Sequence, residues 1–199
     1  MGQAAISILL TGDLVLDEPD GAHWLEGIAP ALRSADLSIG HLEVPHTRRG
    51  AELKGDVPAP GAPPENLAAI AQAGFGMLSL AGNHIADCGA EGIADTIAGL
   101  DGLGVAHTGA GLTLAAARRP AVTVVGGMAV ALLSYNCVGP EMSWAGEDQA
   151  GCAYLRIETA DGAPIAPAAD LAILTEEAVE TLRADIATAR DQAVLDQAV

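Results

Sequence analysis

Three short segments of this sequence place polar side chains of metal-ligand type directly after an apolar run. Asp13 follows the first run, Glu43 closes the second within "GHLE", and Asn83 and His84 follow the third within "GNH". Carboxylate and amide oxygens bind divalent ions such as Mn²⁺, Mg²⁺ or Zn²⁺, and a neighbouring imidazole can bind the ion or transfer a proton. These residue types indicate a metal site, with ordinary turns as the simpler alternative.

The three segments can form one site only if the chain brings their strand ends together. Apolar runs predict strands at 4–13, 36–43 and 76–81, and periodic apolar residues predict helices at 24–35, 65–74 and 90–104. This alternation favours an α/β fold whose sheet is at least partly parallel and covered by helices. Because ligand sites form beyond the carboxyl ends of parallel strands, we expect Asp13, Glu43 and Asn83 to cluster at one edge.

The second part of the chain predicts a hairpin, one more strand and a long helix. Gly126 and Gly127 separate two apolar runs, as in a tight hairpin, and residues 151–159 can form a strand. The clearest helical pattern covers residues 175–193, with Thr175 as its N-cap. The remaining "VLDQAV" is too short and too polar for a further strand, so we expect an unpaired sheet edge open to self-association.

Composition limits the class of protein and its partners. A chain of 199 residues that is 50% hydrophobic is long enough for one domain with an aliphatic core. Its formal net charge of −17 repels nucleic acid and anionic membrane surfaces. The N-terminus lacks a signal-peptide pattern, and no segment offers the roughly 18 uninterrupted apolar residues of a membrane span. The expected location is therefore the cytoplasm.

Several other polar and aromatic residues have simpler structural interpretations. Histidines outside the "GNH" segment are more often structural than ligands, although one of them precedes a glycine-rich loop that could approach a substrate. Arginines in so acidic a chain more often pair with carboxylates than with substrate, and a tryptophan in a glycine-rich loop commonly packs. These residues are His41, His46, His107, Arg118, Arg119 and Trp144.

The same segments resemble a known protein family. The resemblance runs through "TGDLVL", "ADLSIGHLEVPHT", the long block from "AGFGMLSLAGNH" to "GVAHTGAG", "AARRPAV" and "LLSYNCVGP". It covers most of residues 6–157 and is most specific in the long block. The family is the bacterial capsule synthesis protein family CapA, associated with poly-γ-glutamate synthesis, within the calcineurin-like metallophosphoesterase superfamily.

The resemblance implies a fold and a set of roles. Superfamily members carry a two-metal centre at the strand ends of a mixed-sheet α/β/β/α sandwich. Matched by motif, Asp13 would be the first-strand metal ligand, and Glu43 the carboxylate that helps hold or bridge the metals. Asn83 would be the amide ligand, and His84 the catalytic proton donor beside the scissile phosphate.

This sequence departs from the family pattern in two places. His41 stands where the family usually has Asn, and the later His-Trp-Gly and Gly-His-x-Pro-His motifs do not occur. We therefore expect residues 1–199 to form a single truncated domain, incomplete at its C-terminus, with about half of the usual ligands. Divalent ions such as Mn, Zn, Mg or Fe should bind weakly.

Two classes of function follow from the resemblance. The first is a capsule or poly-γ-glutamate biosynthesis protein that hydrolyses a phosphoester with a bound metal ion, acting on a small anionic substrate. The second is a non-catalytic accessory or binding module, or an inactive fragment, that keeps an incomplete metal site and works with the polyglutamate-synthesis machinery. Membership of a fold family does not decide between turnover and binding.

Overall fold

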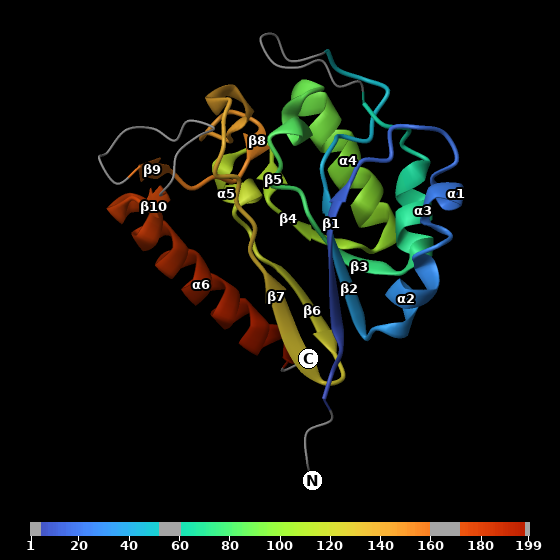
Figure 1. Cartoon of the computed structure of the whole chain (residues 1–199). Helices are drawn as coiled ribbons and strands as arrows, with labels where there is room; N and C mark the ends of the chain where they lie inside the picture. Colours follow the sequence, from blue (N-terminus) through green and yellow to red (C-terminus); the bar gives the residue numbers. More distant parts are fainter. Residues whose placement is uncertain (1–4, 52–60, 160–171, 198–199) are drawn as a thin grey trace.

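Four parallel strands form the main sheet of the protein. The computed structural model describes residues 5–51, 61–159 and 172–197. The strands lie in chain order, as Figure 1 shows: β1 (Ile8–Leu14), β2 (Leu37–Leu42), β3 (Phe75–Ser79) and β4 (Ala106–Thr108). The segments that join them contain helices, because a parallel pair needs a crossover connection. The expected parallel sheet is confirmed.

The helices of this half pack on one face of the sheet. They are α1 (Gly21–Leu25), α2 (Ala29–Ser34), α3 (Asn66–Ala73) and α4 (Gly89–Leu103). The prediction of one helix over 24–35 was wrong, because α1 and α2 are separate. Pro30 lies in the first turn of α2. Proline lacks a backbone N–H and disfavours helical backbone in the preceding residue, so it starts a helix better than it continues one.

A hairpin and a long helix form the second half. Strands β6 (Ala121–Val125) and β7 (Met128–Leu132) pair in antiparallel fashion. Gly126 and Gly127, both with positive φ, form their turn, as the sequence predicted. Helix α6 (Glu176–Gln197) packs on the hairpin. The Thr175 hydroxyl accepts from the Ala178 N–H at 3.1 Å, which confirms the predicted cap.

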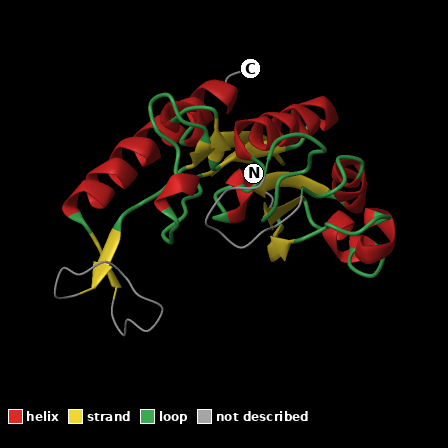
Figure 2. Cartoon of the chain, turned by 90° about the horizontal axis from the view of Figure 1, so that it is seen from above, coloured by secondary structure: helices red, strands yellow, loops and turns green. Residues whose placement is uncertain are grey.

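The order of these layers is helices, parallel sheet, hairpin, helix. Figure 2, viewed from above, shows α6 on one side of the strands and α1 to α3 on the other. A small apolar cluster joins the two strand layers; its buried members are Leu37, Ile39, Met77 and Ala121. The predicted α/β/β/α sandwich is thus confirmed as the fold class.

Short elements complete the structure near the carboxyl ends of the parallel strands. They are η1 (His84–Ala86), β5 (Ala110–Gly111), α5 (Leu114–Ala117), η2 (Glu141–Ser143), β8 (Gly151–Cys152), β9 (Ile157–Thr159) and β10 (Ala172–Leu174). The single strand predicted over 151–159 was wrong, because β8 pairs with β5 whereas β9 pairs with β10. Within the described ranges, no helix is long and apolar enough to cross a membrane.

Candidate metal centre

Strand pairing brings three polar residues into one row. Asp13 of β1 lies opposite His41 of β2, and His41 lies opposite Ser79 of β3. All three are at or near the carboxyl ends of their strands, at the sheet edge where ligand sites form in parallel α/β folds. The backbone register alone therefore places a carboxylate, an imidazole and a hydroxyl side by side.

A β-bulge in β1 decides which way Asp13 faces. Leu10 pairs with Ile39 and Asp13 with His41, so three residue steps of β1 span two steps of β2. Strict alternation would put residues an odd number of steps apart on opposite faces. The extra residue of the bulge reverses that alternation, so Asp13 takes the face that Leu10 has.

The packing of neighbouring leucines identifies that face. Leu9 and Leu14 both pack in the main core beneath the helices, although they are five residues apart. Leu37 and Ile39, which share the face of His41 by alternation, belong to the cluster that touches the hairpin. Asp13 and His41 therefore lie on the hairpin side of the sheet.

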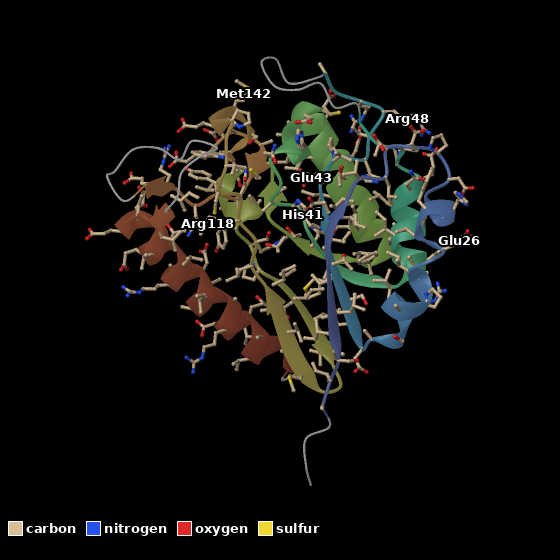
Figure 3. All side chains as sticks on the ribbon, viewed as in Figure 1. Glu26, His41, Glu43, Arg48, Arg118 and Met142 are labelled. Carbon is tan, nitrogen blue, oxygen red and sulfur yellow. The ribbon has the colours of Figure 1, made fainter. Side chains whose placement is uncertain are left out.

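Asp13, His41 and Glu43 form a group that could hold a metal ion. One ligand atom from each residue lies within 4.8 Å of the others. His41 and Glu43 are two residues apart in an extended segment, so both side chains point the same way, and Figure 3 shows them next to each other. His41 Nε2 lies 2.7 Å from Glu43 Oε2, and both side chains are about one-fifth exposed (20% and 18%).

Gly82 leaves the space beside this group open. A Cβ atom at this position would lie 2.8 Å from His41 Nε2 and 3.1 Å from Glu43 Oε2. The backbone of Gly82 does not adopt the left-handed conformation that requires glycine. Glycine is therefore needed here for space, since a side chain would enter the position between the ligand atoms. The donor set and the absence of a side chain at this position are consistent with a site for a small cation.

The "GNH" segment borders the group through Gly82. Asn83 follows directly and is the residue before η1, which His84 begins. His84 Nδ1 lies 2.8 Å from Asp87 Oδ2, and Asp87 is only 2% exposed. A carboxylate accepts hydrogen bonds only, so this contact fixes the orientation of the His84 ring. The roles of Asn83 as a ligand and of His84 as a proton donor stay predictions.

Sequence reasoning missed His41 and Asp87 as members of the site. A structural role was favoured for His41, with ligation left open, and its ring lies within 4.8 Å of ligand atoms of both predicted carboxylates. The available signal was the spacing His-x-Glu at a strand end, which places two ligand types on one face. For Asp87, the signal was its position three residues after His84, the spacing at which side chains meet on a helical turn.

The remaining histidines lie outside the group. His46 is fully buried (0% exposed), and its Nδ1 lies 3.2 Å from the Val44 carbonyl. Burial lowers the pKa of His46 to about 4, so it is neutral at pH 7. His107 Nε2 lies 3.0 Å from Asp101 Oδ1. Both histidines have structural surroundings, as expected.

Two of the other residues weighed from the sequence, Arg118 and Trp144, also have structural partners. Arg118 donates two hydrogen bonds of 2.7 Å to Asp185 of α6. Tyr135 donates to the same carboxylate at 2.6 Å. Trp144 stacks on Tyr154 with a centroid distance of 4.4 Å. Arg118 thus pairs with a carboxylate and Trp144 packs, as the sequence indicated.

Comparison with known proteins now identifies the family. The family model described as "Bacterial capsule synthesis protein PGA_cap" matches residues 7–199, nearly the whole chain. The chain belongs to this bacterial capsule synthesis family. The match confirms the resemblance that the strand-end motifs indicated. It does not by itself assign a reaction to the metal-ligand group.

Curated relatives match a shorter part of the chain. The chain is 39% identical over 85 residues to a protein named "Probable polyglutamine synthesis accessory protein" from two strains of Mycobacterium tuberculosis, CDC 1551 and H37Rv. The matched segment is 41% of this chain and 22% of the relative. That name describes those proteins as accessory to polyglutamine synthesis.

Proposed function

We propose that this capsule synthesis family protein binds a divalent metal ion at Asp13, His41 and Glu43 and hydrolyses a phosphoester there. The observation that carries the proposal is the meeting of three ligand atoms within 4.8 Å at the strand ends. Two carboxylates and an imidazole suit Mn²⁺, Zn²⁺, Mg²⁺ or Fe²⁺. Asn83 is the proposed fourth protein ligand, since it follows the glycine that borders the group.

Each residue of the site has a distinct task in this proposal. Asp13 and Glu43 supply negative charge for the ion, and His41 supplies a neutral ligand. A bound ion would activate water and neutralise charge on the phosphoryl oxygens. That positive charge also offsets the net charge of −17, which would otherwise repel an anionic substrate. His84, oriented by Asp87, donates a proton to the departing oxygen.

The expected affinity for metal is low. The group comprises three side chains, and Asp13 is exposed, so water would occupy the remaining coordination positions of the ion. Multi-metal hydrolytic sites bring together more protein ligands than this. We expect weak Mn²⁺ or Zn²⁺ binding that weakens further when Asp13 is removed.

A second candidate function is a metal-binding accessory protein without turnover. The printed name of the Mycobacterium tuberculosis relatives favours it, because it describes an accessory role. In this case the metal site would stabilise a surface that contacts the polyglutamate-synthesis machinery. The two candidates share the metal site and differ in the need for His84.

Titration calorimetry and a turnover assay separate these candidates. Mn²⁺ and Zn²⁺ are titrated into the wild type, Asp13→Ala and the control His23→Ala, whose histidine is exposed in α1 and is not a member of the ligand group. Turnover of bis(p-nitrophenyl) phosphate is measured with the same proteins and with His84→Ala. Metal-dependent turnover that is lost in His84→Ala supports the hydrolase.

Metal binding that depends on Asp13 without any turnover supports the accessory role instead. Tight metal binding that is unchanged in Asp13→Ala would overturn the proposed site, because any ion would then bind elsewhere.

A further inference from the structure

Two serine hydroxyls continue the hydrogen bonding of His41 away from the ligand group. His41 Nδ1 lies 2.8 Å from Ser79 Oγ, and Ser79 Oγ lies 2.6 Å from Ser134 Oγ. Ser79 ends β3, and Ser134 follows β7 of the hairpin. Glu43, His41, Ser79 and Ser134 thus form an unbroken chain of hydrogen bonds, which we call the serine chain.

The partner of each ring nitrogen defines where the proton of a neutral His41 lies without metal. A carboxylate can only accept, so the short contact with Glu43 places the proton of a neutral His41 on Nε2. Nδ1 is then an acceptor, and the Ser79 hydroxyl donates to it. The Ser134 hydroxyl can in turn donate to Ser79 Oγ.

Metal binding requires the opposite arrangement. A cation that binds Nε2 needs the lone pair of that nitrogen, so the proton of a neutral ring must be on Nδ1. Nδ1 then donates to Ser79 Oγ, and the Ser79 hydroxyl turns to donate to Ser134 Oγ. A hydroxyl can serve in both arrangements because it donates and accepts, whereas a carbonyl or an ammonium group could serve in only one.

We propose that Ser79 and Ser134 are positioning residues of the metal site. Because their hydroxyls can either donate or accept, the proton of His41 can move from Nε2 to Nδ1 when a divalent cation replaces the hydrogen bond to Glu43. One proton leaves Nε2 for solvent and one reaches Nδ1 from solvent, so His41 stays neutral. This inference rests on the metal site of the proposed function but concerns residues outside the ligand group.

The second half of the molecule holds Ser134 in place. Tyr135, the next residue, donates to Asp185 of α6, and Arg118 donates to the same carboxylate. These hydrogen bonds, which we call the Asp185 clamp, tie the segment after β7 to α6 and to the end of α5. The serine chain is therefore a polar contact through which the hairpin layer supports a ligand that β2 provides.

The test combines calorimetry with nitrogen NMR of His41 at pH 8. Zn²⁺ affinity is measured for the wild type, Ser79→Ala, Ser134→Ala and Ser79→Thr. The control is Ser38→Ala, which removes a buried hydroxyl of β2 that donates to the Leu32 carbonyl instead. Nitrogen shifts report which ring atom of His41 carries the proton, with and without Zn²⁺.

We expect Ser79→Ala to weaken Zn²⁺ binding by about 10-fold or more, the usual effect of losing an outer-shell partner, and Ser134→Ala to weaken it less. Ser79→Thr, which keeps the hydroxyl, and Ser38→Ala should bind like the wild type. The NMR shifts should show the proton on Nε2 before Zn²⁺ and on Nδ1 after it. If Ser79→Ala does not fold, the Zn²⁺ affinity of Ser134→Ala and the nitrogen shifts of His41 still test the inference.

Three results would overturn the inference. Unchanged Zn²⁺ affinity in both alanine variants, with normal wild-type binding, would show that the serine chain does not support the metal site, while the metal site itself would stand. A proton that stays on Nε2 in the Zn²⁺ complex would do the same. A wild type that does not bind Zn²⁺ or Mn²⁺ at all would overturn the proposed function together with this inference.

Discussion

The two halves of the sandwich are packed differently. The parallel sheet and helices α1–α4 enclose a core of large aliphatic side chains, among them Leu42, Ile70 and Leu78, all 0% exposed. In the hairpin, Ala121 is the one buried residue, and the buried apolar residues of α6 are the small Ala178 and Ala189, beside the buried carboxylate of Asp185. The first half thus has an apolar core of its own, whereas the second depends more on polar contacts.

The two halves also contribute different residues to the candidate site. Asp13, His41 and Glu43 all come from the well-packed half, where the sheet register fixes their positions. The hairpin half contributes Ser134, which the Asp185 clamp holds through its neighbour Tyr135. Ligands that must meet within a few ångströms are carried by the rigid half, and a supporting hydroxyl by the other.

The largest expected effect is the loss of a core side chain in the first half. Leu78→Ala should lower the free energy of unfolding by about 2–5 kcal/mol, because it removes a fully buried side chain and leaves a cavity. Val124→Ala, in the hairpin where the side chain is 47% exposed, should cost less than about 1 kcal/mol. Urea unfolding measures both. Equal losses would contradict the difference in packing.

The buried His46 should make the first half sensitive to acid. Its pKa is about 4 when folded, against an ordinary value of 6.5, so the unfolded chain binds more protons between these values. Stability should be complete above about pH 6.5 and fall by about 3 kcal/mol as the pH drops to about 4.

The variant His46→Asn keeps a donor near the Val44 carbonyl but does not titrate in this range. Its stability should depend less on pH than that of the wild type, as measured by urea unfolding at several pH values. His23→Asn, which changes an exposed histidine, is the matched control. A wild-type slope that persists in His46→Asn would assign the acid sensitivity to other groups.

Loss of the clamp should have an intermediate effect on the second half. Asp185→Asn removes the charge that binds Arg118 and Tyr135, and should cost about 1–3 kcal/mol because these groups are partly buried. The control Glu180→Gln breaks an exposed pair with Arg183 on the same helix and should cost less than about 0.5 kcal/mol. Similar values for the two variants would show that α6 does not depend on the clamp.

The smallest effect on stability is expected at the outer strand of the main sheet. β1 is at the end of the strand order, and Leu10 is 71% exposed. Leu10→Lys should change the unfolding free energy by no more than about 0.5 kcal/mol, yet reduce self-association, since charge on an edge strand discourages pairing. Analytical ultracentrifugation of both proteins at equal concentration measures this. Identical sedimentation would argue against association through β1.

Much of the fold was predictable from local patterns. The apolar runs that became β2 and β3 were bounded by polar residues and turns, and Gly126 with Gly127 marked the hairpin through the backbone conformation it requires. The break between α1 and α2 was missed because the apolar spacing continues across it while Pro30 interrupts the backbone. Periodicity reports the buried face of a helix and not its continuity.

The site was only partly predictable, for a different physical reason. Asp13 and Glu43 could be named because each follows a strand in the sequence. Ser134 could not, because its contact with Ser79 joins residues 55 positions apart through the packing of the hairpin on the sheet. The place of His41 beside both carboxylates could not be predicted, because the character of a histidine depends on its spatial neighbours, which a single sequence does not reveal.

The face that Asp13 takes depends on the bulge in β1, which leaves one residue of this strand unpaired. Straightening the bulge without removing a residue would exchange the faces of Asp13 and Leu14 and turn the carboxylate toward the aliphatic core, whereas deleting Gly12 would keep Asp13 opposite His41. An outer strand can tolerate such a slip because only one neighbouring ladder has to adjust. The bulge in this strand therefore decides whether Asp13 can join the ligand group, even where every ligand residue is retained.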